Sequence, residues 1–483
     1  MAQQTTNDQG LIAKDIEAYL KEHENKDMLR FLTCGSVDDG KSTLIGRLLY
    51  DSKMIFDDQL AAAESESEKY GTTGEKIDMA LLVDGLQSER EQGITIDVAY
   101  RFFATESRKY IIADTPGHEQ YTRNMVTGAS TADVAIILID ARKSILTQTR
   151  RHSFIVNLLG IEHVIVAINK MDLVDFSEDV FEQIKAEYQA LADELGIQNT
   201  YYIPLSALDG DNVVNVSEQT PWYKGKALLN MLDTLEIRQE IKEENFRFPV
   251  QYVNRPNLDF RGFCGTITSG SVKVGDDITV LPSGKTTKVK SIINAGDITE
   301  KNREATTNEV YAPMAVTLTT EDEVDISRGD MIVHTNAIPR VSNAIKVMLV
   351  WMDEKSMDMQ KTYDIKRATS VVSGSFEHIN YKIDVNTYER TQVEQLELND
   401  IASCKMLLTR PIAADSYKEN KQTGSFIVVD RITNKTVGAG MIVDVAKRES
   451  DKASTEHREY TEAEIALNLY IRENFPEWQC NRV

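Results

Sequence analysis

The sequence contains little cysteine and no long hydrophobic run. Its 483 residues include four cysteines, no two of them within a metal-ligand spacing. This argues against a disulfide framework and favours a reducing compartment. Apolar runs such as Val134–Ile139 are far shorter than the ~20 residues that a membrane-spanning helix needs. Because the first ten residues also lack a signal-peptide pattern, we expect a cytoplasmic protein with no membrane partner.

The sequence also contains fewer basic than acidic residues. Lys and Arg number 54 against 76 Asp and Glu, which gives a formal net charge of −22. The acidic excess lies mainly in residues 1–245, whereas residues 246–445 are close to neutral. A cation-rich nucleic-acid binder is therefore not expected. The 41% of hydrophobic residues is ordinary for a globular protein and excludes a disordered or fibrous chain.

Residues 29–245 alternate short apolar runs with longer amphipathic stretches. The runs are almost uniformly apolar, as in a parallel sheet that is buried on both faces. They predict strands at 30–35, 109–114, 134–140, 163–169 and 201–207. Between them, stretches such as 178–195 have helical spacing. This alternation predicts an α/β domain with a doubly wound, mainly parallel sheet.

The second half of the chain has a different hydrophobic pattern. Residues 246–340 and 343–445 each consist of short β-branched runs separated by turn signals, which predicts two β-barrel domains. We expect a helical extension at residues 1–28, with a helix over 11–23, and a helical tail at 446–483, with a helix over 461–474. Either helix could dock a partner, but we favour packing against the chain's own barrels.

A glycine-rich loop directly follows the first predicted strand. It matches G-x-x-x-x-G-K-[ST] with the residues Gly35, Ser36, Val37, Asp38, Asp39, Gly40, Lys41 and Ser42. Backbone N–H groups of such a loop surround phosphate oxygens, and the helix that begins there adds its positive end. Lys41 would neutralise the β- and γ-phosphates, and Ser42 would ligate Mg²⁺. With a strand before it and a helix after it, this is unlike a chance glycine-rich turn.

Two further motifs predict selection of guanine. The first, Asn169-Lys170-Met171-Asp172, ends a strand at the edge of the sheet where ligands bind. A carboxylate there accepts two hydrogen bonds from guanine and would stay unpaired against adenine. The second, Ser206-Ala207-Leu208, offers a backbone N–H to the base. Either motif alone could be an ordinary loop, but their order behind the phosphate loop predicts a GTP site.

A third strand end carries Asp114-Thr115-Pro116-Gly117-His118. Its aspartate can hold the hydration shell of Mg²⁺, and the glycine N–H can reach the γ-phosphate. The stretch Gly93-Ile94-Thr95 lies between this motif and the phosphate loop, where GTPases keep a mobile threonine that contacts the metal. Release of both segments on loss of the γ-phosphate would make a switch. His118 is the candidate catalytic residue, because its ring can orient the attacking water; simple packing is the alternative.

Together these motifs resemble the translation-factor class of GTPases, in which a GTPase domain precedes two β-barrels. Within that class the chain resembles the CysN family, the GTPase subunits of bacterial sulfate adenylyltransferases. The resemblance covers nearly all of residues 28–445. The segments that carry it are Cys34–Leu60, Ala80–Phe103, Thr149–Ile155, Pro221–Gly225, Val250–Phe263 and Asn434–Ile442.

The resemblance assigns roles to individual residues. It implies phosphate binding by Gly35 to Thr43, and Mg²⁺ coordination by Ser42 and Thr95 directly and by Asp114 through water. It makes His118 the residue that positions water, with Val37 and Ile94 as the apolar pair beside it. Asp38 matches an aspartate that helps bind a monovalent cation such as K⁺ in related GTPases. In place of the HVDHGK and Arg-Gly-Ile-Thr sequences common in elongation factors, this chain has SVDDGK and Gln92 before Gly93, which favours CysN over a tRNA carrier.

The resemblance also implies a partner and a reaction. CysN subunits form a heterodimer with CysD, the subunit that converts ATP and sulfate into adenosine 5′-phosphosulfate and pyrophosphate. GTP hydrolysis drives this unfavourable synthesis, the first step of sulfate assimilation. Two alternatives stay open: a tRNA-binding elongation or termination factor, and a regulatory GTPase without a synthetic role. Arg123, Arg142 and Arg150 lie near the switch region in sequence, but nothing in the sequence makes one of them a catalytic finger.

Overall fold

The computed structural model describes residues 26–52, 60, 67, 79–83, 95, 97–105, 107–237, 245–257, 259–294, 306–445, 468 and 470. The expected helix at 11–23, Gly93 and Ile94 lie outside the described residues, as does the expected helix at 461–474 apart from residues 468 and 470. The chain forms two compact units. The first contains residues 1–239, 350–357 and 381–402, and the second contains the remainder.

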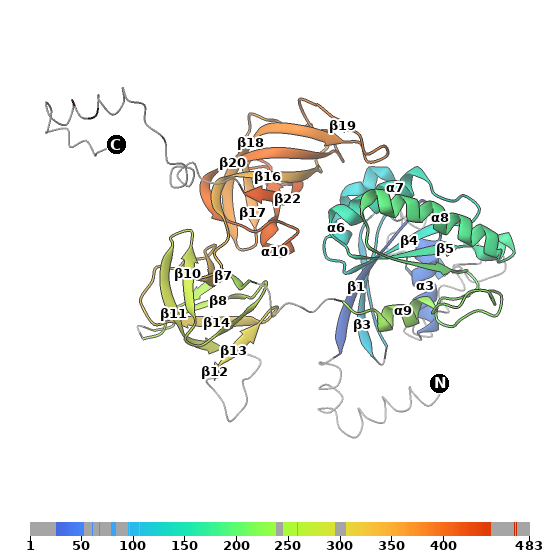
Figure 1. Cartoon of the computed structure of the whole chain (residues 1–483), viewed down its shortest axis with the longest axis horizontal. Helices are drawn as coiled ribbons and strands as arrows, with labels where there is room; N and C mark the ends of the chain where they lie inside the picture. Colours follow the sequence, from blue (N-terminus) through green and yellow to red (C-terminus); the bar gives the residue numbers. More distant parts are fainter. Residues whose placement is uncertain are drawn as a thin grey trace, which may run out of the picture. The chain divides into compact units, whose positions relative to one another are not determined.

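The first unit is built on a six-stranded sheet (Figure 1). Its order is β2 (Ala99–Ala104), β3 (Arg108–Asp114), β1 (Asp27–Cys34), β4 (Val134–Asp140), β5 (His163–Asn169) and β6 (Asn199–Pro204). All neighbours are parallel except β2 and β3. Every residue of β4 is buried, as expected for a strand covered on both faces. The predicted α/β domain with a mainly parallel sheet is confirmed.

Helices cover both faces of this sheet. Apolar side chains of α3 (Lys41–Asp51) and α9 (Leu228–Thr234) form one buried cluster with β1, β3 and β4. The helices α7 (Thr147–Leu158) and α8 (Glu178–Leu195) lie across the opposite face (Figure 1). The bounds of α8 match the helical spacing in the sequence. The strand β2 was not predicted, because its alternate side chains face solvent and it has no uniform apolar run.

The second half of the chain forms two closed β-barrels (Figure 1). The first has the order β10 (Asp277–Leu281), β15 (Met331–His334), β7 (Arg247–Asn254), β8 (Gly262–Thr266), β14 (Ala315–Thr320) and β11 (Lys285–Ile293). Pairing of β10 with β11 closes it. Its interior is lined by the alternate apolar residues of these strands. In addition, β9 (Ser271–Lys273) pairs with β13 (Glu309–Tyr311), and β12 (Thr306–Thr307) pairs antiparallel with the end of β11.

The second barrel closes in the same way. Its order is β17 (Tyr363–Arg367), β21 (Ser425–Val429), β22 (Thr436–Val445), β16 (Val341–Trp351), β20 (Ile401–Ala413) and β18 (Ser370–Ile383). Pairing of β17 with β18 closes the barrel, and β19 (Arg390–Thr391) pairs antiparallel with the end of β18. The prediction of a GTPase-type α/β domain followed by two barrels is therefore confirmed as an architecture.

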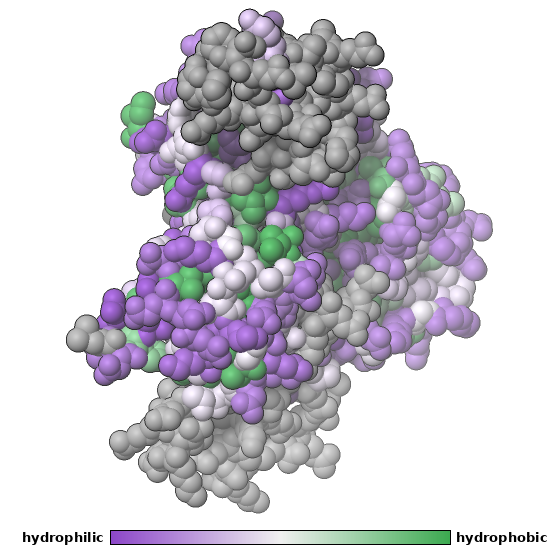
Figure 2. Space-filling view, turned by 60° about the vertical axis from the view of Figure 1, so that its left-hand side comes forward, coloured by the Kyte–Doolittle hydropathy of each residue, from purple (hydrophilic) through white to green (hydrophobic). Residues whose placement is uncertain are grey.

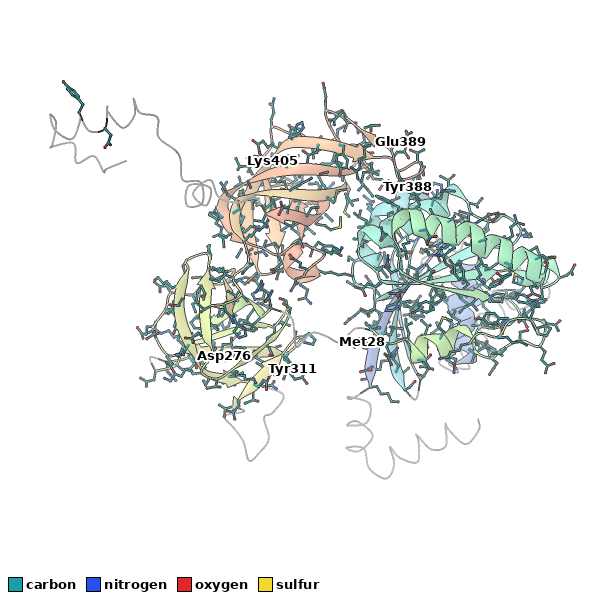
Figure 3. The ribbon with its side chains drawn as sticks, in the orientation of Figure 1. Met28, Asp276, Tyr311, Tyr388, Glu389 and Lys405 are labelled. Atoms are coloured by element: carbon teal, nitrogen blue, oxygen red, sulfur yellow. The ribbon has the colours of Figure 1, made fainter. Side chains whose placement is uncertain are left out.

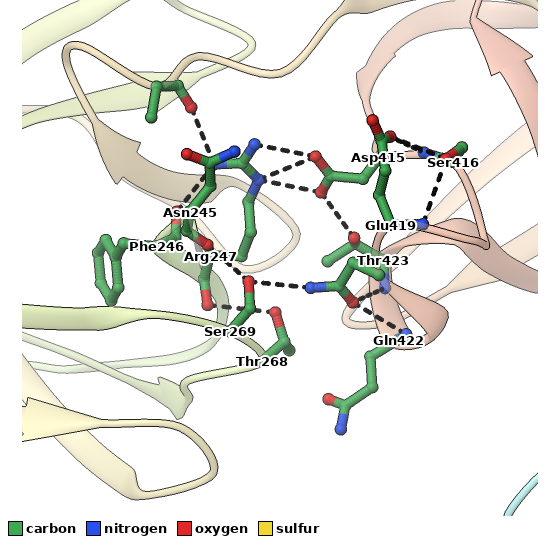
Figure 4. A network of polar contacts seen from close by, with 12 residues as sticks. Asn245, Phe246, Arg247, Thr268, Ser269, Asp415, Ser416, Glu419, Gln422 and Thr423 are labelled. Atoms are coloured by element: carbon green, nitrogen blue, oxygen red, sulfur yellow. Dashed lines mark hydrogen bonds and ion pairs between the residues drawn. The ribbon is translucent and has the colours of Figure 1, made fainter. Parts of the chain in front are cut away.

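Within the second unit, a buried ion pair links a residue of β7 to the segment that follows β20 (Figure 4). The guanidinium of Arg247 donates to both carboxylate oxygens of Asp415 at 2.9–3.1 Å, and the Thr423 hydroxyl donates to the same carboxylate at 2.7 Å. The other Arg247 nitrogen donates to the carbonyl oxygens of Phe246 and Ala337. Every charge in this junction is thus compensated, as a buried ion pair requires.

The surface drawn in Figure 2 is mostly hydrophilic, with apolar side chains in small separate groups. None of the helices in the described part of the chain has the length and apolar character needed to cross a membrane.

Candidate nucleotide-binding site

The phosphate loop lies between β1 and α3, as the sequence predicts. Helix α3 begins at Lys41, and Gly40 before it has φ 91°, a left-handed conformation that favours glycine. A Cβ atom on Gly40 would lie 2.5 Å from Nδ2 of Asn169. The ammonium of Lys41 is folded back over the loop and donates to the carbonyl oxygens of Gly35 at 3.1 Å and Ser36 at 2.8 Å. The loop is thus wrapped around a buried cation.

A buried carboxylate balances this cation. Asp39 is 1% exposed and accepts a hydrogen bond of 2.6 Å from the backbone N–H of Ser36. Burial raises the pKa of Asp39, although the positive charge of Lys41 opposes the change. Burial likewise lowers the pKa of Lys41, opposed by Asp114 and Asp39. Oγ of Ser36 and Oδ1 of Asp39 have no hydrogen-bond partner among the described residues, which is unusual for buried polar atoms and typical of a ligand site.

The Asp-Thr-Pro-Gly motif lies directly against the phosphate loop. Asp114 ends β3 beside Thr33 of β1, whose hydroxyl donates to Oδ1 of Asp114 at 3.4 Å. The hydroxyl of Thr115 donates to the carbonyl oxygen of Thr33 at 2.7 Å. A Cβ atom on Gly117 would lie 2.6 Å from both the Gly35 carbonyl oxygen and Nζ of Lys41. Only glycine allows this approach, so the Asp-Thr-Pro-Gly motif packs directly against the phosphate loop.

His118 follows this close contact and is half-buried. Its Nδ1 atom accepts a hydrogen bond of 3.3 Å from the backbone N–H of Gln120, and its ring packs edge-on near Tyr121. A neutral histidine that accepts at Nδ1 carries its proton on Nε2. Nε2 of His118 is therefore a donor in this arrangement.

Asn169 connects three parts of the site. Its Nδ2 atom donates to the Asp39 carbonyl oxygen at 2.7 Å, and its Oδ1 atom accepts from the Ala207 N–H at 2.9 Å. The phosphate loop and the Ser206-Ala207-Leu208 loop are thereby linked through one buried side chain. Of the backbone donors in the loop expected to contact the base, the Ala207 N–H is used by Asn169, so a contact of a base with this N–H would compete with the hydrogen bond.

Lys170 is held by a carboxylate that the sequence analysis did not identify. Asp140 ends β4, and its side chain is fully buried. It lies 3.2 Å from Nζ of Lys170 and accepts hydrogen bonds from Nε, Nη2 and the backbone N–H of Arg142 at 2.7–3.0 Å. Burial alone would raise the pKa of Asp140, but the hydrogen bonds from Arg142 and Lys170 hold it below its usual range. Lys170 also donates to the Asp38 carbonyl oxygen.

Arg47 is a second residue that sequence reasoning missed. It projects from α3 and donates to the carbonyl oxygens of Ala207, at 3.3 Å, and Leu208. Asp51, one turn later in α3, lies 3.6 Å from Nη1 of Arg47. The helix that follows the phosphate loop therefore also anchors the predicted base loop. The only signal in the sequence is an arginine inside an amphipathic helix, which is too common to be informative.

The remaining described candidates are Asp172, Asp38, Thr95 and Arg142. Asp172 is half-buried in a 3₁₀ turn (Met171–Val174) directly after Lys170, and the Asp38 side chain is exposed. Thr95 is half-buried next to an undescribed stretch. Arg142, one of the three arginines near the switch region, is bound to Asp140. The described arrangement thus presents backbone N–H groups, one buried lysine and several carboxylates at the carboxyl edge of a parallel sheet, where nucleotides bind.

Comparison with known proteins identifies the family. Residues 26–237 match the elongation factor Tu GTP binding domain, and residues 344–443 match the GTP-eEF1A C-terminal domain-like family. Sulfate adenylyltransferase subunit 1 of Sulfurovum sp. (strain NBC37-1) is 80% identical over 97% of this chain and 98% of that protein. This chain belongs to the sulfate adenylyltransferase subunit 1 family. Members from Cellvibrio japonicus and Aliarcobacter butzleri are 60% and 59% identical over 97% and 98% of the chain.

Membership in the subunit 1 family confirms the resemblance drawn from the sequence. The family is a family of enzyme subunits, and its name implies a second subunit. The matched elongation-factor domain contains the phosphate loop, the Asp-Thr-Pro-Gly motif and Asn169-Lys170-Met171-Asp172, and such domains bind GTP, usually with Mg²⁺.

Proposed function

We propose that this chain is the GTP-hydrolysing subunit of a sulfate adenylyltransferase. With a CysD-type subunit 2, it couples GTP hydrolysis to the synthesis of adenosine 5′-phosphosulfate and pyrophosphate from ATP and sulfate. The observation that carries the proposal is the 80% identity over 97% of the chain to a sulfate adenylyltransferase subunit 1, combined with an intact phosphate loop.

The residues of the site fit GTP and Mg²⁺. The buried Lys41 and the backbone of Gly35–Thr43 form a cradle for the phosphates, and the buried Ser36 hydroxyl faces no other described partner. Ser42 and Thr95 would hold the metal directly and Asp114 through water, because hydroxyl and carboxylate oxygens suit Mg²⁺. When bound, Mg²⁺ neutralises charge on the β- and γ-phosphates.

Asp172 would read the guanine edge, with Asn169 and Lys170 fixing the loop that carries it. The support is structural: Asn169 joins the phosphate loop to the Ala207 loop, and Lys170 joins Asp140 to the backbone of Asp38. Because the base and phosphate loops are bonded to each other, the site is preorganised for a nucleotide that fills both.

His118 would position the attacking water. With Nδ1 engaged by Gln120, the Nε2–H group can donate to a water oxygen and orient it without removing its proton. The exposed side chain of Asp38 is the candidate ligand for a monovalent cation such as K⁺, and the half-buried Val37 is one of the apolar pair expected to flank His118.

Coupling to the partner requires a difference between nucleotide states. A GTPase that contacted subunit 2 identically with GTP and GDP would couple nothing, because a ligand shifts an equilibrium only by its differential affinity. Gly117 and Lys41 supply a physical origin for such a difference. A Cβ atom on Gly117 would lie 2.6 Å from Nζ of Lys41, so a γ-phosphate bound by Lys41 would place an acceptor beside the backbone of Gly117 that GDP lacks.

The decisive experiment is co-expression with a CysD-type subunit and measurement of sulfate-dependent pyrophosphate release. We expect GTP to increase the extent of phosphosulfate formation, and a non-hydrolysable analogue to give no such increase. The matched control is Lys41→Ala in the same complex, which should bind the partner and lose the effect of GTP. Equal synthesis with and without GTP would contradict the proposal.

A further inference from the structure

Arg47 uses all three nitrogen atoms of its guanidinium group. Nε donates to the carbonyl oxygen of Ala207 at 3.3 Å, and Nη2 donates to the carbonyl oxygen of Leu208. Nη1 lies 3.6 Å from the carboxylate of Asp51, one turn further along α3. Only 15% of the Arg47 side chain is exposed, so solvent competes little for these contacts. The guanidinium is therefore held in one orientation, and it in turn holds two consecutive peptide groups.

These hydrogen bonds fix the direction in which the base loop, residues 206–210, presents its donors. The peptide bond between Ala207 and Leu208 is trans, so its N–H group points away from its carbonyl group and therefore away from Arg47. The other N–H groups of the loop that have acceptors belong to Ser206, Ala207, Asp209 and Gly210. The Leu208 N–H has no acceptor in the described part of the chain. Arg47 thus turns one unused donor of the base loop away from α3.

Packing alone does not explain an arginine at this position. Helix α3 is already anchored by buried apolar side chains, which belong to Leu44, Ile45, Leu48 and Leu49. An apolar side chain in place of Arg47 would cover the loop but would not orient its peptide groups, because that requires hydrogen bonds to the carbonyl oxygens. The planar fork of arginine reaches two neighbouring oxygens at once. Arg47 therefore contributes something that the packing of α3 does not supply.

The helix that carries Arg47 also carries the lysine of the phosphate loop. It begins at Lys41, and Arg47 follows ~9 Å further along the helix axis. Because the helix is a rigid element over this distance, the contacts of Arg47 set the position of the base loop relative to the phosphate loop. Asn169 connects the same two loops through its side-chain amide. The base loop is thus held from two sides, and only Arg47 holds its carbonyl groups.

We propose that Arg47 is a positioning residue for guanine selection, which acts through the orientation of the peptide group between Ala207 and Leu208. The inference rests on the proposed GTP site, in which Asp172 accepts hydrogen bonds from the N1–H and N2–H₂ groups of the base. The next group on that edge of guanine is O6, a hydrogen-bond acceptor, whereas adenine has an amino donor there. With its carbonyl groups held by Arg47, the loop presents the Leu208 N–H to such an acceptor, and an amino group would leave this donor unsatisfied.

Binding of two nucleotides by the full-length protein tests this role. GDP is compared with 6-thio-GDP, which keeps the N1–H and N2–H₂ groups and has sulfur, a weaker acceptor, in place of O6. We expect the parent to bind GDP ~10-fold more tightly than 6-thio-GDP, and Arg47→Met to reduce this preference to ~2-fold by weakening GDP. In GTP hydrolysis the same variant should raise KM and leave kcat unchanged, because the base contact is made equally in the ground state and the transition state.

Arg108→Met is the matched control. Arg108 also donates to two backbone carbonyl oxygens, those of Leu232 and Leu235, and 12% of its side chain is exposed. It begins β3 at the same end of the sheet as Met28 (Figure 3), ~20 Å from Asp114 at the other end of the strand. Its replacement should lower the melting temperature and leave the preference for GDP unchanged.

Arg47→Lys provides the same test if the methionine variant does not fold. It keeps a positive charge beside Asp51 but replaces the fork by a single nitrogen, so its preference for GDP should lie between those of the parent and Arg47→Met. An unchanged preference in a folded Arg47 variant, or equal weakening of both nucleotides, would overturn the inference and leave the proposed function intact. A parent that binds neither nucleotide would overturn both.

Discussion

Replacing Asp140 by asparagine removes the negative charge that holds Lys170, which lies in the loop expected to contact guanine. The carboxylate is fully buried, accepts three hydrogen bonds from Arg142 and pairs with Lys170 at 3.2 Å. Asparagine has the same shape but no charge, and its NH₂ group would face two cations. Lys170 would keep its hydrogen bond to the Asp38 carbonyl oxygen and lose its ionic partner.

The size of the effect follows from burial. Removing one partner of a fully buried ion pair costs ~3–5 kcal/mol. The side chains of Lys170 and Arg142 are 22% and 46% exposed, so solvent screens part of this loss. We therefore expect a loss of about 2 kcal/mol. Because Lys170 fixes the loop expected to contact the base, we assign this loss to the conformation that binds nucleotide, which corresponds to roughly 30-fold weaker binding. GTP and GDP should be affected equally, because both carry the same base, and the rate of hydrolysis at saturating GTP should change little.

Titration with a fluorescent GDP and a fluorescent GTP analogue measures this difference. Asp179→Asn is the matched control, because Asp179 is an exposed carboxylate in the first turn of α8. Thermal melting without nucleotide shows whether the variant is folded. A folded Asp140→Asn protein that binds both nucleotides within threefold of the parent would refute the assignment of Asp140 as the anchor.

Three further substitutions test two residues of the site and one buried histidine of α7. Asp172→Asn should weaken GTP and tolerate xanthosine triphosphate, because an amide donates where the carboxylate accepted; unchanged preference in a competition assay would defeat the guanine assignment. His118→Ala should slow hydrolysis by ~10²-fold or more with nearly unchanged GTP affinity, and equal losses in both would mark His118 as structural. Burial, with the nearby charges of Lys41 and Arg151, lowers the pKa of His152 to about 3 from 6.5. In the unfolded chain His152 therefore binds a proton below pH 6.5, whereas in the folded chain it does so only near pH 3. The free energy of unfolding therefore falls as pH falls from 6.5 to about 3. Between pH 7 and pH 5 the parent should lose about 2 kcal/mol more than His152→Gln in urea unfolding, and equal slopes would contradict the burial argument.

The parts of the site that can be recognised in the sequence are the motifs in which binding requires particular residue types at fixed spacing. The phosphate loop, Asp114 to Gly117 and Asn169 to Asp172 each follow a buried strand, and a parallel sheet brings strand ends to one edge. Their clustering could therefore be predicted before any coordinates. The roles given to the individual site residues stay predictions, and for Thr95 and Asp38 the described contacts of the site do not include the side chains.

The supporting residues could not be found in this way. Arg47 and Asp140 act across long sequence separations, and an arginine in a helix or an aspartate after a strand has many ordinary uses. The same holds for β2, whose half-exposed pattern is weak in the sequence and becomes a strand through its pairing with β3.

The amino-acid sequence alone determines the order of the domains and the chemistry of the nucleotide motifs, because local spacing and hydrophobic period specify both. The tertiary structure decides which side chains hold these motifs in register. Asn169 bonds to two loops, Lys170 pairs with Asp140, and Gly117 lies close to Lys41. Each of these contacts forms only when strands that are distant in the sequence are paired side by side. Such contacts depend on distances between elements, and those distances are set by the packing of the whole sheet.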